Sequence, residues 1–132
     1  MSVKLINDFR MKIYKLLSED GELSNKLDRV YLFVVPDAKY PFISVNLINS
    51  EKTCVPRAIF YEVEFDISFF SRDKNKASAD LITERVADLL NIKALRSVIN
   101  NIVGINTISV TTNQSADFIT NKTSIRYKAL LK

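Results

Sequence analysis

The sequence contains no histidine and a single cysteine, and these scarcities remove most of the familiar catalytic and metal-binding chemistry. Without histidine there is no histidine-based triad, no imidazole metal ligand and no ordinary proton shuttle near neutral pH. Because Cys54 stands alone, there is no internal disulfide and no cysteine cluster for zinc. Carboxylates, lysine and tyrosine remain as chemical groups. We therefore predict that the protein is not an enzyme and uses no cofactor.

Glycine, proline and long apolar runs are also scarce. Two glycines and three prolines argue against a loop-rich or repetitive architecture. No apolar run approaches the roughly 20 residues of a membrane-spanning helix. Asn7, Asp8 and Arg10 interrupt the apolar positions early, so no secretory signal is expected. We expect one domain over residues 1–132 that stays in the cytoplasm of the cell that makes it.

The charge of the chain is mildly basic, with a formal net charge of +4 and a pI near 9.2. A nucleic-acid-binding protein usually gathers its lysines and arginines into a patch. Here they are spread from Lys4 to Lys132. This spread favours a solvated surface over a phosphate-binding role.

Apolar residues recur at helical spacing in some segments and at strand spacing in others. Helices are expected over residues 2–17 and 76–90, with short helical turns at 22–27 and 94–98. Strands are expected over residues 29–35, 42–48, 58–70, 105–112 and 120–131, the first of them well buried.

Polar segments and glycines mark the expected connections between these elements. Gly21 should end the first helix in a left-handed conformation, and Gly104 should precede the fourth strand. Residues 49–57 are expected to form a surface loop or a loose hairpin arm, and residues 113–117 a turn. The order α-β-β-β-α-β-β predicts an α+β fold, in which a mainly antiparallel sheet of about five strands carries two main helices on one face.

The strand expected over residues 58–70 shows the clearest pattern. Its apolar side chains alternate with Glu62, Glu64 and Asp66, so one face packs on the core and the other meets water or a partner. It is longer than the usual strand of about 5–6 residues, which suits a contact between subunits. Arg126 and Lys128 alternate in the same way in the last strand, and would oppose the acidic row if the two strands were neighbours.

The acidic row has three interpretations. Three carboxylates on one strand face resemble a site for Mg²⁺ or Mn²⁺, although successive positions lie roughly 6.5–7 Å apart, which is wide for one shared cation. The favoured interpretation is solvated or cross-strand-paired charge, and a subunit contact is the third. Phe60 and Phe70 lie on the same polar face at the two ends of the row, which is typical of a protein interface.

The polar segment 49–57 contributes two further candidates. Cys54 has Lys52 and Arg57 near it in sequence, but an incidental cysteine is favoured over a reactive one. The candidate interface residues, taken together, are Glu62, Glu64, Asp66, Phe60, Phe70, Arg126, Lys128, Cys54 and Arg57.

Several stretches together resemble a known family. An opening helix leads to RVYLFVVPDAKYPFISVNL and a polar excursion; the long strand YEVEFDISFFSRD follows, then the helix ASADLITERVADLL and the closing strand TSIRYKALL. The order is similar to that of the small tail-completion, or tail-terminator, proteins of long-tailed phages, prophages and gene-transfer-agent particles. The resemblance covers nearly the whole chain and consists of patterns of apolar alternation.

The resemblance implies a structural role in particle assembly. Such subunits form a ring, usually hexameric, that caps the head-proximal end of the tail tube and provides the docking surface for the head connector. DNA would pass through the lumen without sequence-specific binding, and no membrane would be involved. The partners would be further copies of the chain, the tube protein and the connector or stopper, first in the bacterial host and then in the particle. In this setting residues 49–57 would be an arm that reaches a neighbour or the tube, and the acidic row would line the lumen.

Two alternatives remain open. One is a head-tail stopper or neck adaptor of the same particle. The other is a small metal-dependent nuclease or phosphotransfer enzyme that uses Glu62, Glu64 and Asp66.

Overall fold

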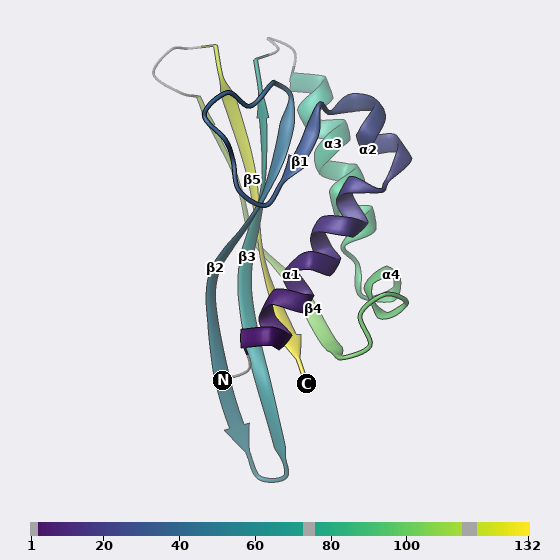
Figure 1. Ribbon diagram of the computed structural model, residues 1–132, viewed down its shortest axis with the longest axis vertical. Helices are drawn as coiled ribbons and strands as arrows, with labels where there is room; N and C mark the ends of the chain where they lie inside the picture. Colours follow the sequence, from purple (N-terminus) through teal and green to yellow (C-terminus); the bar gives the residue numbers. More distant parts are fainter. Residues whose placement is uncertain (1–2, 73–75, 115–118) are drawn as a thin grey trace.

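The computed structural model describes residues 3–72, 76–114 and 119–132, and in them five strands form one sheet (Figure 1). The elements follow in the order α1 Val3–Ser18, α2 Gly21–Lys26, β1 Arg29–Tyr31, β2 Phe42–Val55, β3 Ala58–Ser71, α3 Lys76–Leu89, α4 Ile92–Arg96, β4 Ile102–Gln114 and β5 Asn121–Leu131. The strand order is β1-β2-β3-β5-β4, and every neighbouring pair is antiparallel except β1 and β2. The predicted α+β class, the element order and the mainly antiparallel sheet are confirmed.

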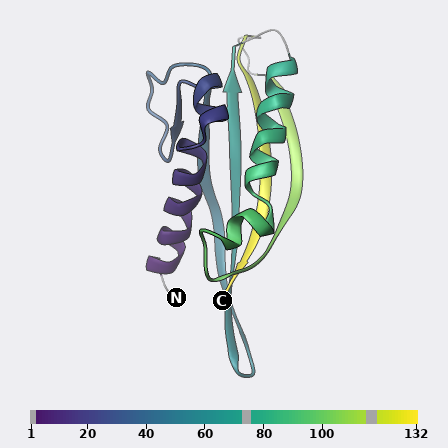
Figure 2. The same cartoon turned by 90° about the vertical axis from the view of Figure 1, so that its right-hand side faces the viewer.

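The helices cover one face of the sheet, as predicted (Figure 2). We call it the helix-covered face and the other the open face. The four buried residues of α1 recur at helical spacing: Ile6, Phe9, Ile13 and Leu17. Beneath the helices β3 contributes Val63, Phe65, Ile67 and Phe69, and β5 contributes Ile125, Tyr127, Ala129 and Leu131. The alternation read from both strands therefore builds the core. None of the helices in the described ranges is both long and apolar enough to cross a membrane.

The expected strand 29–35 is wrong beyond Tyr31. Because β1 and β2 are parallel, residues 32–41 must return the chain to the start of β2, and they take the apolar run out of the sheet. Phe33 is 74% exposed, and Val34 and Val35 are exposed as well. The Arg10 guanidinium lies 4.7 Å from the Phe33 ring centroid, and its Nη2 donates a hydrogen bond to the Leu32 carbonyl (3.0 Å).

Three expected boundaries also differ from the structure. Gly21 is not in a left-handed conformation; it opens α2, because the Asp20 side chain caps that helix directly after α1. Gly104 lies inside β4, at a register shift between Ile102 and Gly104, so this strand begins earlier than expected. Of the turn expected over residues 113–117, Asn113 and Gln114 belong to β4, and residues 115–117 lie outside the described residues.

Strand β4 forms one edge of the sheet and is exposed on both faces along much of its length. Residues 106–114 are all exposed, including Val110 at 56%. A second register shift separates Thr107 from Ser109. Only its inner side pairs with a strand, β5.

Asp20 ties α2 to α3. Its Oδ2 accepts hydrogen bonds from the Leu23 N–H (3.1 Å) and from Arg85 Nε (3.0 Å), and its Oδ1 lies 2.5 Å from Arg85 Nη2. The hydrogen bonds from Arg85, and next the one from the Leu23 N–H, hold the pKa of Asp20 below its usual value against the opposing effect of burial. The carboxylate therefore stabilises the fold as an anion.

Two substitutions of Asp20 should separate the contribution of the N-cap to stability from that of the ion pair. Asp20→Asn keeps an N-cap of similar quality and loses the ion pair, whereas Asp20→Ala also loses a cap worth about 1 kcal/mol. At pH 7 we expect stability to fall in the order wild type, Asn, Ala in urea unfolding. Since the folded pKa is lowered, the advantage of the wild type over Asp20→Asn should be full above about pH 5 and shrink as the pH falls below about 4. Equal stability of wild type and Asp20→Asn at pH 7 would contradict a stabilising ion pair.

The pKa of Tyr127 is raised, whereas that of Asp20 is lowered. Its hydroxyl is buried, has no hydrogen-bond partner in the described part of the chain, and burial raises its pKa to about 12. Tyr127→Phe should leave stability at pH 7 unchanged or raise it by up to about 1 kcal/mol, because the unpaired hydroxyl is removed. Because the folded pKa is raised, the wild type should lose stability as the pH rises from about 10 to 12, and the variant should lose less. Urea unfolding at pH 7 and 11 tests both expectations.

Candidate interaction surface

The hairpin formed by β2 and β3 is the most protruding feature of the molecule (Figure 1). Pairing runs from Phe42 opposite Phe70 to Val55 opposite Ala58. On β3, pairing with β5 stops at Tyr61, which lies opposite Leu131. Residues 53–60 therefore extend beyond the helices and the other strands, and we call them the arm (Figure 2). None of their side chains is buried.

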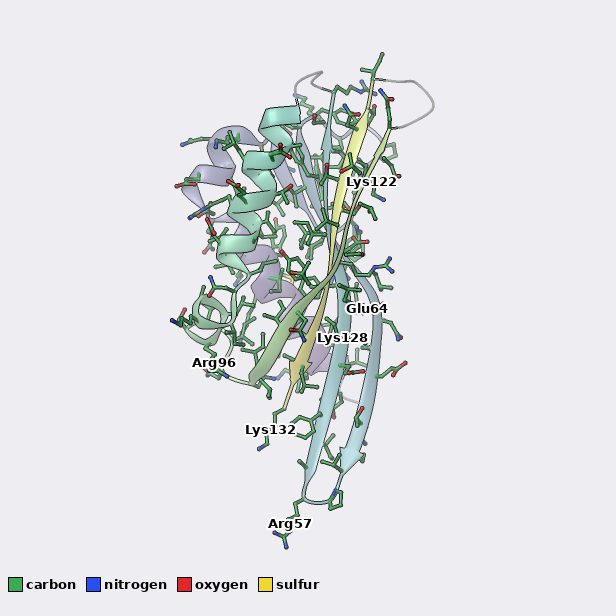
Figure 3. All side chains as sticks on the ribbon, turned by 180° about the vertical axis from the view of Figure 1, so that it is seen from behind. Arg57, Glu64, Arg96, Lys122, Lys128 and Lys132 are labelled. Atoms are coloured by element: carbon green, nitrogen blue, oxygen red, sulfur yellow. The ribbon has the colours of Figure 1, made fainter. Side chains whose placement is uncertain are left out.

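The expectation of a surface loop at residues 49–57 is therefore wrong, and the hairpin-arm alternative is confirmed. This stretch lacks apolar periodicity because it has no core to face, and pairing with β3 supplies the strand geometry that composition did not indicate. Cys54 and Arg57 lie at or near the tip and are exposed; Arg57 points away from the body (Figure 3).

A two-residue turn, Pro56 and Arg57, closes the arm. Proline first and a positive φ second define a type II turn, in which the second residue is normally glycine. Arg57 has a φ of 77°, a backbone conformation that is costly for a residue with a Cβ. Arg57→Gly should raise the free energy of unfolding by about 0.5–1 kcal/mol, measured by urea denaturation. A loss of stability would show a different turn.

Seven of the nine predicted interface residues lie on the open face of β3 and β5: Phe60, Glu62, Glu64, Asp66, Phe70, Arg126 and Lys128. Glu64 lies opposite Lys128 and Asp66 opposite Arg126, so the predicted juxtaposition of opposite charges is present (Figure 3 labels Glu64 and Lys128). In the described residues, however, neither pair comes within 4 Å as an ion pair. Asp66 instead accepts hydrogen bonds from Asn46 Nδ2 (2.9 Å) and Ser68 Oγ (3.3 Å). Glu64, Arg126 and Lys128 can therefore pair across the ladder or with a partner, whereas Asp66 is held by Asn46 and Ser68.

On the open face, the acidic side chains belong to β2 and β3 and the basic side chains belong to β5. Glu51 of β2 lies directly opposite Glu62 of β3, next to the base of the arm. Like charges in opposed positions destabilise a ladder, so this pair favours a cationic neighbour. On β5, Lys122 shares the open face with Arg126 and Lys128. One half of the face is therefore acidic and the other basic.

The two aromatic residues of the predicted interface do not form one site with the charges. Phe60 lies in the arm, and Phe70 lies ten positions along β3, roughly 33 Å away at about 3.3 Å per residue. Phe70 stacks on Phe42, with ring centroids 4.8 Å apart, and the Lys122 ammonium lies 5.6 Å from its ring. Phe70 is thus part of an aromatic cluster at the far end of the sheet.

A metal centre finds no support in this geometry. Within the described ranges, no three histidine, cysteine, aspartate or glutamate side chains converge closely enough to hold a metal ion. Glu62, Glu64 and Asp66 stand in a row on one strand face, at successive steps of roughly 6.5–7 Å.

Sequence patterns missed one candidate surface. Phe33, Val34 and Val35 form a run of three exposed apolar side chains beside the short edge strand β1. The run was interpreted as a buried strand because it is β-branched and aromatic. The proline that follows it and its lack of alternating polar residues do not distinguish a buried strand from an exposed loop.

Comparison with solved structures gives a strong likeness in fold. No protein-family model matches the sequence, and no curated protein matches it either. The fold is similar to that of a chain in a solved structure described as "Virion of native gene transfer agent (GTA) particle". The TM-score is 0.81, the alignment covers 98% of both chains, and 15% of the aligned residues are identical. The two chains therefore share a fold along their whole length.

Proposed function

We propose that this protein is a structural subunit of a phage-like particle, in which copies form a ring that caps the tail tube and receives the head connector. The observation that carries the proposal is the likeness, over 98% of both chains, to a component of a gene-transfer-agent virion. The exposed arm agrees with a role in assembly.

A closed ring needs two different surfaces on each subunit, because each copy contacts its two neighbours through unlike patches. The chain offers unlike surfaces at separate places. The arm extends from one end of the sheet, the apolar run Phe33–Val35 flanks β1, and the exposed strand β4 forms the opposite edge. In the proposed ring, the arm reaches a neighbouring copy or the tube.

The earlier placement of the acidic row in the lumen receives less support. Such a wall would repel DNA only if its charge were of one sign. β5 sets Lys122, Arg126 and Lys128 on the same face as Glu62, Glu64 and Asp66. We propose instead that these rows contribute to contacts between proteins, with the acidic base of the arm meeting cationic side chains of its neighbour.

The first test is the mass of the purified chain by light scattering during size-exclusion chromatography, over a concentration series. A discrete multimer near six copies supports the ring. The second test adds the chain to its polymerising tube protein and measures tube lengths by electron microscopy. Capping should shorten the tubes at sub-stoichiometric amounts; a chain that is monomeric and leaves tube length unchanged is not a terminator.

The stopper or adaptor alternative makes a different prediction. An adaptor of the neck should bind the connector and leave tube polymerisation unaffected. A pull-down with the purified connector, run beside the tube assay, separates these two roles.

A further inference from the structure

A pocket of about 470 Å³ lies at the end of the sheet opposite to the arm. Pro41 and Ser71, which line it, flank the end of the ladder where Phe42 pairs with Phe70, whereas the turn of the arm closes the other end. In Figure 1 this is the upper end, where β3 finishes and α2 and α3 lie. The volume is within the range of about 300–1,000 Å³ that is usual for ligand sites. One end of the molecule thus projects and the other is hollowed.

The pocket has an apolar lining. Phe69 of β3 and Ile82 of α3 are buried parts of the core, and Tyr40 and Pro41 come from the segment before β2. Leu81 also lines the pocket and is 51% exposed, although large apolar side chains on a helix normally face the core. An exposed leucine beside a hollow gives an occupant apolar surface to cover.

Among the described lining residues, the cationic ones are Lys26 and Arg72. Arg72 is held in place: its Nε donates a hydrogen bond to Thr120 Oγ1 (3.2 Å), and its guanidinium lies 4.3 Å from the Tyr40 ring centroid. Neither its terminal nitrogens nor the Lys26 ammonium has a partner within the described part of the chain. No carboxylate stands among the described lining residues. Arg72 therefore offers a positioned guanidinium to an occupant, and Lys26 contributes a second positive charge.

This chemistry selects the class of occupant. A purely apolar side chain would cover two cations without pairing them, which is costly. A nucleic-acid phosphate would pair with the cations and leave the apolar lining empty. We propose that the pocket docks a segment of a partner protein in which a bulky apolar side chain stands next to aspartate or glutamate. That the partner is a neighbouring component of the particle rests on the proposed function. The chemistry of the pocket, and therefore the kind of segment that it binds, does not depend on that function.

The test uses the full chain and two matched peptides, acetyl-Asp-Phe-Asp-amide and acetyl-Asn-Phe-Asn-amide. Titration is followed by NMR at the methyl groups of Leu81 and Ile82. We expect the acidic peptide to shift these resonances and to bind at least about tenfold more tightly than the amide peptide, because charge-assisted hydrogen bonds reach both cations. Equal affinities, or shifts that avoid both residues, would overturn the proposal.

Matched variants separate the pocket from general charge. Lys26→Glu with Arg72→Glu should abolish the preference for the acidic peptide. Lys93→Glu with Lys132→Glu makes the same change in net charge away from the pocket and should leave the preference intact. Leu81→Glu alters an exposed helix position, so the variant should fold and still lose binding. If the first and second pairs of substitutions act alike, the effect is nonspecific electrostatics and the proposal fails.

The result of the peptide titration does not depend on whether the chain forms a ring. Peptide binding by a chain that neither assembles nor caps tubes would support the pocket and refute the proposed function. A ring that caps tubes but shows no preference for the acidic peptide would support the proposed function and refute the proposed pocket.

Discussion

Removing the arm should leave a folded monomer, because in the proposed ring the arm reaches a neighbouring copy. The variant deletes residues 53–60 and joins Lys52 to Tyr61 through Asn-Gly, a sequence that favours a two-residue hairpin turn. Lys52 and Tyr61 are cross-strand partners, so the register of the remaining ladder is kept. No deleted side chain is buried, and we expect the melting temperature to change by only a few degrees. Light scattering should show loss of the multimer, and tube capping should be lost with it.

Two observations guard this interpretation. Far-UV circular dichroism and thermal unfolding must show that the shortened chain is folded. Arg57→Gly keeps the full arm, removes the charge at its tip and should stabilise the turn, so it separates the length of the arm from its charge. A shortened chain that still forms the multimer would exclude the arm from the subunit interface.

Phe65→Ala should be among the most damaging single substitutions in the chain. Phe65 is buried, stacks on Tyr127 with ring centroids 5.4 Å apart, and meets Phe9 edge-on at 5.5 Å. It thereby joins α1 to the middle of the sheet. Truncation of a buried phenylalanine costs about 3–5 kcal/mol, against a total of about 5–15 kcal/mol for a typical domain. The melting temperature should fall by roughly 10–20 °C, measured by calorimetry.

The matched control is Phe60→Ala, on the same strand and with the same side chain removed. Phe60 lies in the arm on the open face and is half-buried. Its truncation should cost less than about 1 kcal/mol. Similar losses in the two variants would mean that β3 does not present alternate faces to core and solvent.

The sequence was most informative where a segment faces the core along its whole length. Ile6, Phe9, Ile13 and Leu17 follow the helical period, and Val63, Phe65 and Ile67 follow the strand period, so both elements were predicted closely. The alternation of charge in the two strands indicated that Arg126 and Lys128 would oppose the acidic row if the strands were neighbours, and β3 and β5 are neighbours in this register.

Prediction failed where the environment of a residue is set by distant parts of the chain. Residues 49–53 are polar on both faces, yet they form a strand because β3 lies beside them. Phe33 has the composition of a core residue and is exposed because the parallel pairing of β1 and β2 requires a return segment. The pocket could not be read from the sequence, since Lys26, Tyr40, Arg72 and Leu81 come from four separate segments. Its one local hint is an apolar residue, Leu81, directly before the buried Ile82 in α3.

The outer edge of β4 has a consequence for how the protein behaves while it accumulates. An open strand edge is a template on which further chains add side by side, and at high concentration such growth leads to fibres. In β4 the register shifts at Gly104 and between Thr107 and Ser109 bend the strand and interrupt the even row of backbone donors and acceptors. Threonine, serine and asparagine side chains occupy much of the remaining edge. These features disfavour the repetitive growth of fibres along this edge and leave it to a partner that pairs with it in one defined orientation.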